Sequence, residues 1–414
     1  MPHFRFLHAA DLHLDSPLVG LSRKSVEYAA RIDDASRRAF DNLIDLAIAE
    51  QCRFVVIAGD VFDGQWRSYQ TGLFFAERMR RLDRAGIRVV MIFGNHDAEN
   101  RFASRLELAD NVHILSRSQA SSFHLEDLET VIHGRSFPER SVTENLALTY
   151  PTPAAGRFNI GLLHTACSGA ADGHAPYAPC TVEQLANHRY DYWALGHVHA
   201  TKFLSTQPYI VYPGNLQGRH AREAGPKGAV LVTVDGGKVL SAEHRPLDVI
   251  RWSVEELDVS AAEDIPTLHG LVRDRMERAL GAADGRGLAL RLWLCGETAL
   301  HSELVTTRTS LREEIETIAT HVSPELWLEK LDLQTRPPQR AESTDPTIAG
   351  KVRAAIAALE GDSIVTDWLE LELKAIKAKL PATAHMDELF TRLREEGPKR
   401  AVDLALSMID RGQE

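Results

Sequence analysis

Five short apolar segments in the first half of this chain each lead into an aspartate, an asparagine or a histidine, and this repeated arrangement constrains the fold more than any other feature. The five polar sites fall between residues 10 and 200, at the ends of segments that read as buried strands. Longer segments with apolar residues at helical spacing lie between them. Alternation of this kind is typical of a layered α/β fold around a buried sheet.

The alternation is clearest in the first hundred residues. Strands are predicted at residues 4–9, 54–58 and 87–93, and amphipathic helices at residues 25–50 and 68–85. From residue 110 to about 245 the apolar runs come closer together, which predicts a second sheet packed on the first. Its strands are predicted at residues 112–115, 122–125, 131–133, 159–164, 192–195, 209–212, 229–234 and 238–242, with a hairpin turn at Asp235-Gly236-Gly237.

The pattern of predicted helices and strands changes after residue 245, and a length of 414 residues favours two or three domains. A small α+β module is predicted, with a helix at 268–280, a strand at 288–294, a helix at 301–320, a strand at 326–333 and a linker at 334–339. Three helices are predicted beyond it, at 346–359, 363–380 and 385–410. We therefore expect one domain at residues 1–245, a second at 246–335 and a helical region at 336–414.

Charge and cysteine content narrow the function classes. A formal net charge of −11 would repel a polyanion such as DNA, so contact with nucleic acid would need a local basic surface or bound cations. The four cysteines form no C-x-x-C pair and are too sparse for a disulfide scaffold, so we expect free thiols. The sequence contains no signal-type N-terminus and no apolar run of about 18 residues, which predicts a cytoplasmic protein without membrane contact.

The first two polar sites supply carboxylates. Asp11 and His13 are one residue apart, so in extended chain their side chains point the same way and could grip one ion. Gly59 permits a tight turn that places Asp60 at the end of the second strand, where its two oxygens could bridge two cations. Taken alone, the D-x-H pair is a weak signal, and an aspartate after glycine is as easily part of a surface turn.

The other three sites supply amide and imidazole groups. Asn95 offers a neutral oxygen ligand, and the adjacent His96 could serve as a general acid. A single histidine such as His164 is more often structural than a ligand. His197 and His199, one residue apart behind another apolar strand, are a stronger signal because imidazole is a common ligand of borderline metals.

In order along the chain these sites read D-x-H, G-D-x-x-D, G-N-H-D, a single H and G-H-x-H, and this series resembles the motifs of the calcineurin-like metallophosphoesterase superfamily. Within the superfamily, the stretches at residues 8–17 and 212–220 resemble those of the bacterial SbcD-like DNA repair exonucleases, more narrowly the YhaO type. The resemblance implies a four-layer α-β-β-α sandwich, a small α+β capping module and a C-terminal helical segment.

The resemblance also implies a role for each polar side chain. One ion would be held by Asp11, His13, Asp60 and His199, and the other by Asp60, Asn95, His164 and His197, with Asp60 as the bridge. His96 would stabilise developing charge or protonate the leaving oxygen, and Asp97 or Asp63 could orient a histidine. Two Mn²⁺ ions are expected, although mixed oxygen and imidazole ligands would equally suit iron, zinc or magnesium.

Substrate contacts are expected from the loop after residue 213 and from the segment after the third motif. The candidates are Asn215, Gln217, Arg219, His220 and Arg101. Backbone amides near glycine and the two-pronged arginine side chain both suit phosphate, and a sequence-blind nuclease should grip phosphates rather than base edges. Without the resemblance, a plain charged loop is an equally good interpretation.

The C-terminal region has no chemical motif of its own. In SbcD-like proteins the corresponding region forms a cap and then helices that dock onto an SMC-like ABC ATPase, so the resemblance implies that partner here, together with DNA and a homodimer. Apolar pairs such as Ile356 with Leu359 and Trp368 with Leu371 fit a partner groove. They fit packing within the protein equally well.

Three functions follow from these features. The leading hypothesis is a Mn²⁺-dependent DNA exonuclease or endonuclease that acts in DNA repair as the nuclease component of a complex with such an ATPase. The second keeps the phosphodiesterase and changes the substrate to a cyclic nucleotide or another small phosphodiester, which the negative charge allows and the long C-terminal region disfavours. The third is a non-enzymatic protein of the ATPase complex with a DNA-tethering or regulatory role, which the intact ligand set disfavours.

Overall fold

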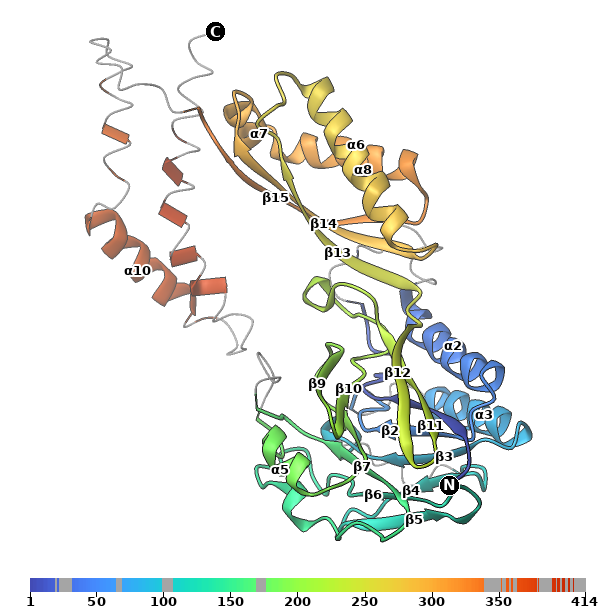
Figure 1. Ribbon diagram of the computed structural model, residues 1–414. Coiled ribbons are helices and arrows are strands. Elements are labelled where there is room, and N and C mark those ends of the chain that lie inside the picture. The colour runs from blue at the N-terminus through green and yellow to red at the C-terminus, as the bar shows by residue number, and fades with distance from the viewer. Residues whose placement is uncertain are drawn as a thin grey trace. The chain divides into compact units, whose positions relative to one another are not determined.

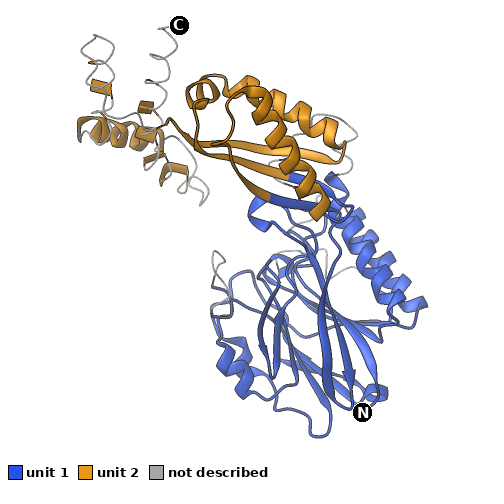
Figure 2. Ribbon diagram, turned by 45° about the horizontal axis from the view of Figure 1, so that its top comes forward, with its two compact units in different colours: residues 1–253, 283–289 blue, residues 254–282, 290–414 orange. Residues whose placement is uncertain are grey.

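The computed structural model describes most of the chain. The described residues are 1–18, 21, 32–64, 69–98, 107–168, 176–338, 351, 355–356, 359, 363–377, 379, 389–391, 393–394, 397–398, 401–402 and 405. They form two compact units, shown in different colours in Figure 2. Unit 1 comprises Met1–Ser253 and Ala283–Ala289, and unit 2 comprises Val254–Ala282 and Leu290–Glu414.

A mixed six-stranded sheet in unit 1 carries the first three polar sites. In spatial order its strands are β12 (Lys238–Pro246), β11 (Gly228–Asp235), β1 (Phe4–Ala9), β2 (Phe54–Ala58), β3 (Arg88–Ile92) and β4 (Val112–Ile114). Strands β1 to β4 are parallel, and β11 is antiparallel to both β1 and β12. The parallel strands read as continuous apolar runs because both faces of the sheet are covered.

A second six-stranded sheet carries the remaining polar sites. In spatial order its strands are β5 (Ser121–Leu125), β6 (Thr130–Gly134), β7 (Phe158–His164), β8 (Tyr192–Gly196), β10 (Tyr209–Tyr212) and β9 (Lys202–Thr206). Strands β6, β7, β8 and β10 are parallel, and the edge strands β5 and β9 are antiparallel to their neighbours. Consecutive parallel strands therefore end at one edge of each sheet.

The two sheets pack face to face, with helices on their outer faces (Figure 1). Phe6 and Phe54 of the first sheet stack with their ring centroids 4.9 Å apart, and Phe6 meets Tyr192 of the second sheet edge to face at 5.4 Å. Helices α2 (Ala35–Ala49) and α3 (Gln70–Arg84) cover the outer face of the first sheet. The short helix α5 (Val182–Asn187) and the segment around residues 137–150 cover the second. The predicted α-β-β-α sandwich is confirmed.

The predicted strands of unit 1 are confirmed as strands, but the assignment of residues 112–115, 229–234 and 238–242 to the second sheet is wrong, because β4, β11 and β12 pair within the first sheet. The hairpin at Gly236 and Gly237 joins β11 to β12 with both glycines at positive φ. Strand β9 was not predicted. The helix predicted at 25–50 coincides with α2 only from Ala35 onward, and residues 22–31 lie outside the described residues. All four cysteines are free thiols, as predicted.

Unit 2 contains a three-stranded sheet with helices packed on it. The strands are β13 (Ile250–Asp258), β14 (Gly287–Glu297) and β15 (Leu326–Arg336), and the helices are α6 (Ile265–Ala282), α7 (His301–Thr306) and α8 (Arg308–Val322). The first residues of β13 and β14 belong to unit 1. Strand β13 was not predicted, although its alternation of apolar and polar residues is a strand signal.

Two predictions in this region need correction. The single helix predicted at 301–320 is two helices, which are divided at Thr307, where the backbone leaves the helical conformation with φ −100° and ψ +19°. The linker predicted at 334–339 begins later, because β15 continues to Arg336, whose carbonyl oxygen accepts a hydrogen bond from the Thr298 backbone.

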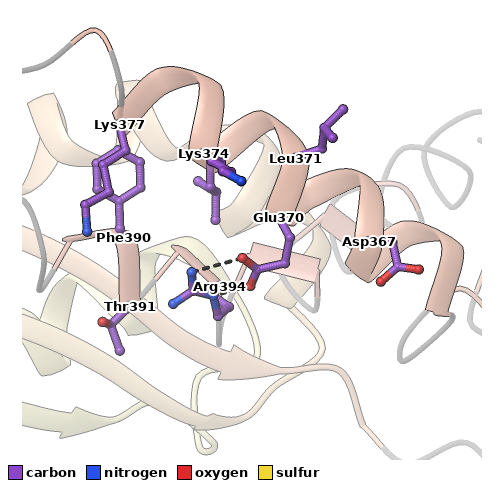
Figure 3. Close-up of a pocket in the computed structure, with 9 residues that line it drawn as sticks. Asp367, Glu370, Leu371, Lys374, Lys377, Phe390, Thr391 and Arg394 are labelled. Atoms are coloured by element: carbon purple, nitrogen blue, oxygen red, sulfur yellow. Dashed lines mark hydrogen bonds and ion pairs between the residues drawn. The ribbon is translucent and has the colours of Figure 1, made fainter.

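The C-terminal part of unit 2 contains α10 (Ser363–Lys377), which corresponds to the helix predicted at 363–380. Arg394 pairs with Glu370 of α10, and the Lys377 ammonium lies 5.9 Å from the centre of the Phe390 ring (Figure 3). The helices predicted at 346–359 and 385–410 fall largely outside the described residues. Among the residues that the structure describes, no helix has the length and apolar character to cross a membrane.

Candidate metal centre

The polar sites predicted from the sequence converge at the ends of strands from both sheets. Asp11, Asp60 and Asn95 follow the adjacent parallel strands β1, β2 and β3, while His164 ends β7 and His197 follows β8. All five side chains are buried. The stacking of the two sheets therefore brings together residues up to 186 positions apart, as in the bond from the His197 backbone to Asp11.

The backbone at these strand ends adopts a conformation that side chains other than glycine rarely take. The φ angles are +51° at Asp11, +42° at His13, +52° at Asp60 and +101° at His197. Each such residue costs about 1–2 kcal/mol. The expectation that Asp11 and His13 converge because the chain is extended is therefore wrong in its reason. Their side chains converge because two left-handed residues turn the chain after β1.

Two motif glycines are required by close packing in the same place. A Cβ on Gly94 would lie 2.2 Å from Asp60 Oδ1 and 2.8 Å from the Asp60 backbone nitrogen. A Cβ on Gly59, whose φ is +93°, would lie 2.6 Å from His164 Nδ1. These glycines therefore allow three strand ends to approach one another around a shared centre.

One half of the centre is formed by His164, Asn95 and Asp60. The Asn95 Oδ1 atom lies 2.9 Å and the Asp60 Oδ2 atom 3.4 Å from His164 Nε2. His164 Nδ1 is 2.9 Å from the Ala58 carbonyl oxygen, which can only accept, so Nδ1 carries the proton and Nε2 can present its lone pair. Without a metal, a proton on Nε2 would occupy this place, because burial lowers the pKa of His164 but the charge of Asp60 raises it to about 9. A metal ion between the same three side chains would replace that proton.

The other half is formed by Asp11, His13 and His199. The Nε2 atoms of the two histidines face each other at 3.2 Å, and Asp11 Oδ1 lies 3.8 Å from His199 Nε2. His199 Nδ1 donates to Glu223 Oε1 at 2.7 Å, so the Nε2 lone pair of His199 points toward His13. This arrangement of imidazole nitrogens and carboxylate oxygens also fits a cation, and the ligand-type groups lie close enough together to hold one.

The electrostatics of the buried carboxylates favour bound cations. Burial raises the pKa of Asp11 to about 7, although His164 acts in the opposite direction. Burial would raise the pKa of Asp60 as well, but the neighbouring His164 outweighs it and lowers the pKa. Carboxylates without solvent contact are costly to ionise unless positive charge compensates them, and divalent ions would supply that charge.

His96 is more exposed than the buried groups around it, with 32% of its side chain accessible. Its Nδ1 atom lies 3.0 Å from Asp63 Oδ1, and Ser16 donates to the other oxygen of Asp63 at 2.9 Å. Burial alone would lower the pKa of His96, but the bond to Asp63 and the charge of Asp60 raise it. The imidazole is thus oriented and biased toward the protonated form, which suits a general acid.

Asp97 does not orient a histidine, which the sequence had left open between Asp97 and Asp63. The Asp97 carboxylate is buried and accepts hydrogen bonds from the backbone nitrogens of Val61, Phe62 and Gly94, at 3.2, 2.9 and 3.0 Å. It therefore ties the loop after β2 to the loop after β3, and Asp63 is the residue beside His96.

The loop after β10 contains the predicted substrate contacts except Arg101, which lies outside the described residues. Asn215 and Gln217 are buried, and their amide groups bond to Glu223 and to the backbone of Val249 and Ile250, so they help to hold the loop. Arg219 and His220 are partly exposed, at 18% and 39% of their side chains.

Glu223 is the important residue that the sequence analysis missed. It is buried and contacts His199, yet it lies outside every motif. Its position four residues after Arg219 is the only local signal, and a single glutamate in a loop is too common to single out.

Comparison with known proteins places the chain among phosphoesterases. A family model described as calcineurin-like phosphoesterase matches residues 4–201, and one described as metallophosphoesterase YhaO, middle domain, matches residues 252–336. An uncharacterized metallophosphoesterase YhaO of Bacillus subtilis is 36% identical over 352 residues, which cover 83% of this chain and 85% of that protein.

Two more distant relatives are named for DNA repair and for a nuclease. The DNA double-strand break repair protein Mre11 of Archaeoglobus fulgidus is 25% identical over 311 residues, covering 69% of this chain and 67% of that protein. A component of the nuclease SbcCD of Bacillus subtilis is 34% identical over 125 residues, covering 30% of each chain.

Proposed function

The chain belongs to the calcineurin-like phosphoesterase family, and from this premise we propose that it is a two-metal DNA nuclease. Family membership makes it a metal-dependent hydrolase of phosphoester bonds, and the predicted YhaO type is confirmed. One observation carries the proposed mechanism: facing nitrogen and oxygen acceptors at the strand ends lie beside a partly exposed, oriented histidine. The relatives named for Mre11 and for the nuclease SbcCD support DNA as the substrate.

The proposed ligands form two overlapping sets that share Asp60. The first set is Asp11, His13, Asp60 and His199, and the second is Asp60, Asn95, His164 and His197. We propose Mn²⁺ for both positions, because the donors are hard oxygens and borderline imidazoles without a thiolate. Bound divalent ions would supply Lewis-acid stabilisation of the phosphoryl oxygens and would make water a stronger nucleophile.

The protein's own residues would complete the chemistry. Asp63 accepts from His96 Nδ1, so the Nε2 atom of His96 is left to donate a proton to the leaving oxygen of the phosphodiester. Arg219, beside His199, would grip a phosphate oxygen of the backbone, and His220 lies next to it at the more exposed end. These contacts read phosphate rather than base, which suits cleavage without sequence preference.

The test is cleavage of labelled linear DNA in Mn²⁺ by the full chain. We expect His96→Ala to lose at least about 100-fold in rate while binding Mn²⁺ as the unaltered protein does, because a general acid contributes about 10²–10⁴-fold. His124→Ala, which removes an exposed histidine of β5, is the matched control and should cleave normally. Equal cleavage by the His96 and His124 variants would remove the role given to His96.

The same assay decides between DNA and a small phosphodiester. The net charge of −11 is the observation that favours the small substrate. Hydrolysis of cyclic nucleotides without cleavage of linear DNA would establish the alternative. A regulatory protein without enzymatic function would instead leave an Asp60→Ala strain with normal DNA repair.

We propose further that residues 246–335 form a cap and residues 336–414 a docking region for an SMC-like ABC ATPase. The apolar residues Ile364, Trp368 and Leu371 follow one another at helical spacing on α10 and are 77%, 60% and 69% exposed. Trp368→Glu should abolish copurification with the ATPase and leave phosphodiester hydrolysis intact. Sedimentation of the isolated chain would show whether it also forms the expected homodimer.

A further inference from the structure

Glu223 connects the metal centre to the substrate-side loop, although it belongs to neither set of predicted residues. Its carboxylate is buried and accepts four hydrogen bonds. The donors are His199 Nδ1 at 2.7 Å, Asn215 Nδ2 at 2.8 Å, the Arg219 backbone nitrogen at 2.7 Å and Arg219 Nη2 at 3.2 Å. The four hydrogen bonds of this carboxylate come from two sources. Three come from Asn215 and Arg219, in the loop that contains the candidate phosphate-binding residue Arg219, and one comes from His199, the proposed metal ligand.

The geometry points to Glu223 as a positioning residue that fixes the tautomer and the orientation of His199 for metal binding while it holds Arg219 beside the same imidazole. This inference rests on the proposed role of His199 as a metal ligand. It assigns two functions to Glu223. Glu223 keeps His199 in the tautomer that can bind a metal, and it sets how closely the positive charge of Arg219 can approach the ions.

The tautomer of His199 follows from the positions of three neighbouring atoms, which are Arg219 Nη2, His199 Nδ1 and Glu223 Oε1. Arg219 Nη2 lies 3.2 Å from His199 Nδ1 and also 3.2 Å from Glu223 Oε1. A guanidinium group only donates, and His199 Nδ1–H already donates to Oε1, so the contact between the two nitrogens is not a hydrogen bond. Glu223 Oε1 attracts both donors and offsets their repulsion. His199 Nε2 is thereby kept free of a proton and able to bind a cation.

Loss of the carboxylate would reverse this arrangement. Without Oε1, Arg219 Nη2 could donate directly to His199 Nδ1, and the imidazole proton would then move to Nε2, the atom that should bind the metal. The net positive charge near the ion would also rise, because Arg219 would lie beside a divalent ion without the negative charge of Glu223. Both effects weaken the ion held by His199.

The backbone of His199 itself has anchors that do not involve Glu223. The Lys227 ammonium donates to the His199 carbonyl oxygen at 2.7 Å, and the Asn215 backbone nitrogen donates to the same oxygen at 3.3 Å. A Cβ on Gly214 would lie 3.0 Å from this oxygen, so the loop packs closely against it. We therefore expect Glu223 variants to keep the fold and to change the imidazole.

The test measures Mn²⁺ binding to the full chain without substrate, by electron paramagnetic resonance of free Mn²⁺. Glu223→Ala should weaken one of two Mn²⁺ ions by about 10–100-fold, the usual effect of removing a carboxylate behind a histidine ligand, and leave the other ion unchanged. The control is Asp248→Asn, which alters another buried carboxylate held by arginines, Arg251 and Arg286. It should bind Mn²⁺ normally.

Two further variants separate positioning from general damage. Arg219→Ala should bind both ions normally, and the double variant Glu223→Ala/Arg219→Ala should regain most of the lost affinity, because the competing donor is gone. In ¹⁵N spectra of the metal-free protein, His199 should carry its proton on Nδ1 in the unaltered protein and on Nε2 in Glu223→Ala.

Normal binding of both ions by Glu223→Ala, or a double variant as weak as the single one, would overturn the inference. If Glu223→Ala does not fold, Glu223→Gln takes its place. Its amide oxygen can still accept from His199, so it should lose less affinity than an alanine and keep the Nδ1 tautomer, and the opposite tautomer would refute the role. Binding of fewer than two ions by the unaltered protein would overturn the two-metal proposal itself, a result distinct from a failure specific to Glu223.

Discussion

Replacing Gly94 by alanine tests how tightly the two strand ends must pack around the metal centre. The added Cβ would meet Asp60 Oδ1 at 2.2 Å, the Asp60 backbone nitrogen at 2.8 Å and His164 Cε1 at 2.8 Å. None of these atoms is free to move, because Asp60 Oδ1 accepts the His96 backbone N–H at 2.9 Å and His164 is held by the Ala58 carbonyl oxygen. We therefore expect a cost of about 3 kcal/mol, the upper end of the range for overpacking.

This free-energy cost can reduce either the stability of the fold or the affinity for Mn²⁺, and the assay measures both. If the fold absorbs it, the melting temperature of unit 1 should fall by about 6–12 °C, since a domain of this size loses about 2–4 °C per kcal/mol. If Asp60 moves aside instead, Mn²⁺ affinity should fall by about 100-fold, the same free energy expressed as binding. Calorimetry with and without Mn²⁺ distinguishes these outcomes.

Gly270→Ala is the matched control for this substitution. Gly270 lies in α6, has no atom within 4 Å of an added Cβ, and should gain about 1 kcal/mol from the better helix propensity of alanine. A Gly94→Ala protein that melts within about 2 °C of the unaltered protein and binds Mn²⁺ equally well would refute the argument from close packing.

Four other changes have definite expected outcomes. Asp97→Asn should destabilise unit 1 by about 1–3 kcal/mol, measured by urea unfolding, because an amide cannot accept from all three backbone donors. Burial lowers the pKa of His8 to about 3, so its neutral form is favoured in the fold and stability is lost as pH falls below 6.5. The loss should reach about 2 kcal/mol at pH 5 and be smaller in His8→Gln, compared by urea unfolding at pH 7 and pH 5. With chelator present, Asp11→Gly should be more stable than Asp11→Ala by about 1 kcal/mol in thermal melts, because φ is +51° there; equal melting would show no strain. Mn²⁺ at about 100 times its dissociation constant should add about 2.7 kcal/mol to unit 1, and Asp60→Asn should show no such shift.

The sequence predicted the layered fold and the gathering of polar groups because both depend on local patterns. Continuous apolar runs identify strands that are covered on both faces, and the residue after each run is then placed at a strand end. Asp60 and Asn95 could be located in this way without knowing strand order, since β2 and β3 turned out to be neighbours. Strand β9, with its partly exposed polar residues, gave no such pattern.

The remainder of the site depends on contacts between segments that are distant along the chain. Asn215 and Gln217 look like ligand contacts in sequence because they are polar residues near glycines, and only the folded loop turns their amides inward. Whether Asp63 or Asp97 faces His96 depends on the turn after β2, which residue types do not determine. Local sequence reading therefore finds the groups that do chemistry more readily than the groups that hold them.

The strained backbone explains why the motif residues are less free to vary than their chemistry alone requires. Four residues at positive φ, Asp11, His13, Asp60 and His197, together cost about 4–8 kcal/mol, which is comparable to the whole stability of a typical domain. Hydrogen bonds from the Asp11 nitrogen to the Gly59 oxygen and from the His13 nitrogen to the Asp60 oxygen, at 3.0 and 3.1 Å, offset part of it. Aspartate and histidine tolerate this conformation better than bulky side chains do, so the residue types that bind a metal are also those that the turn accepts.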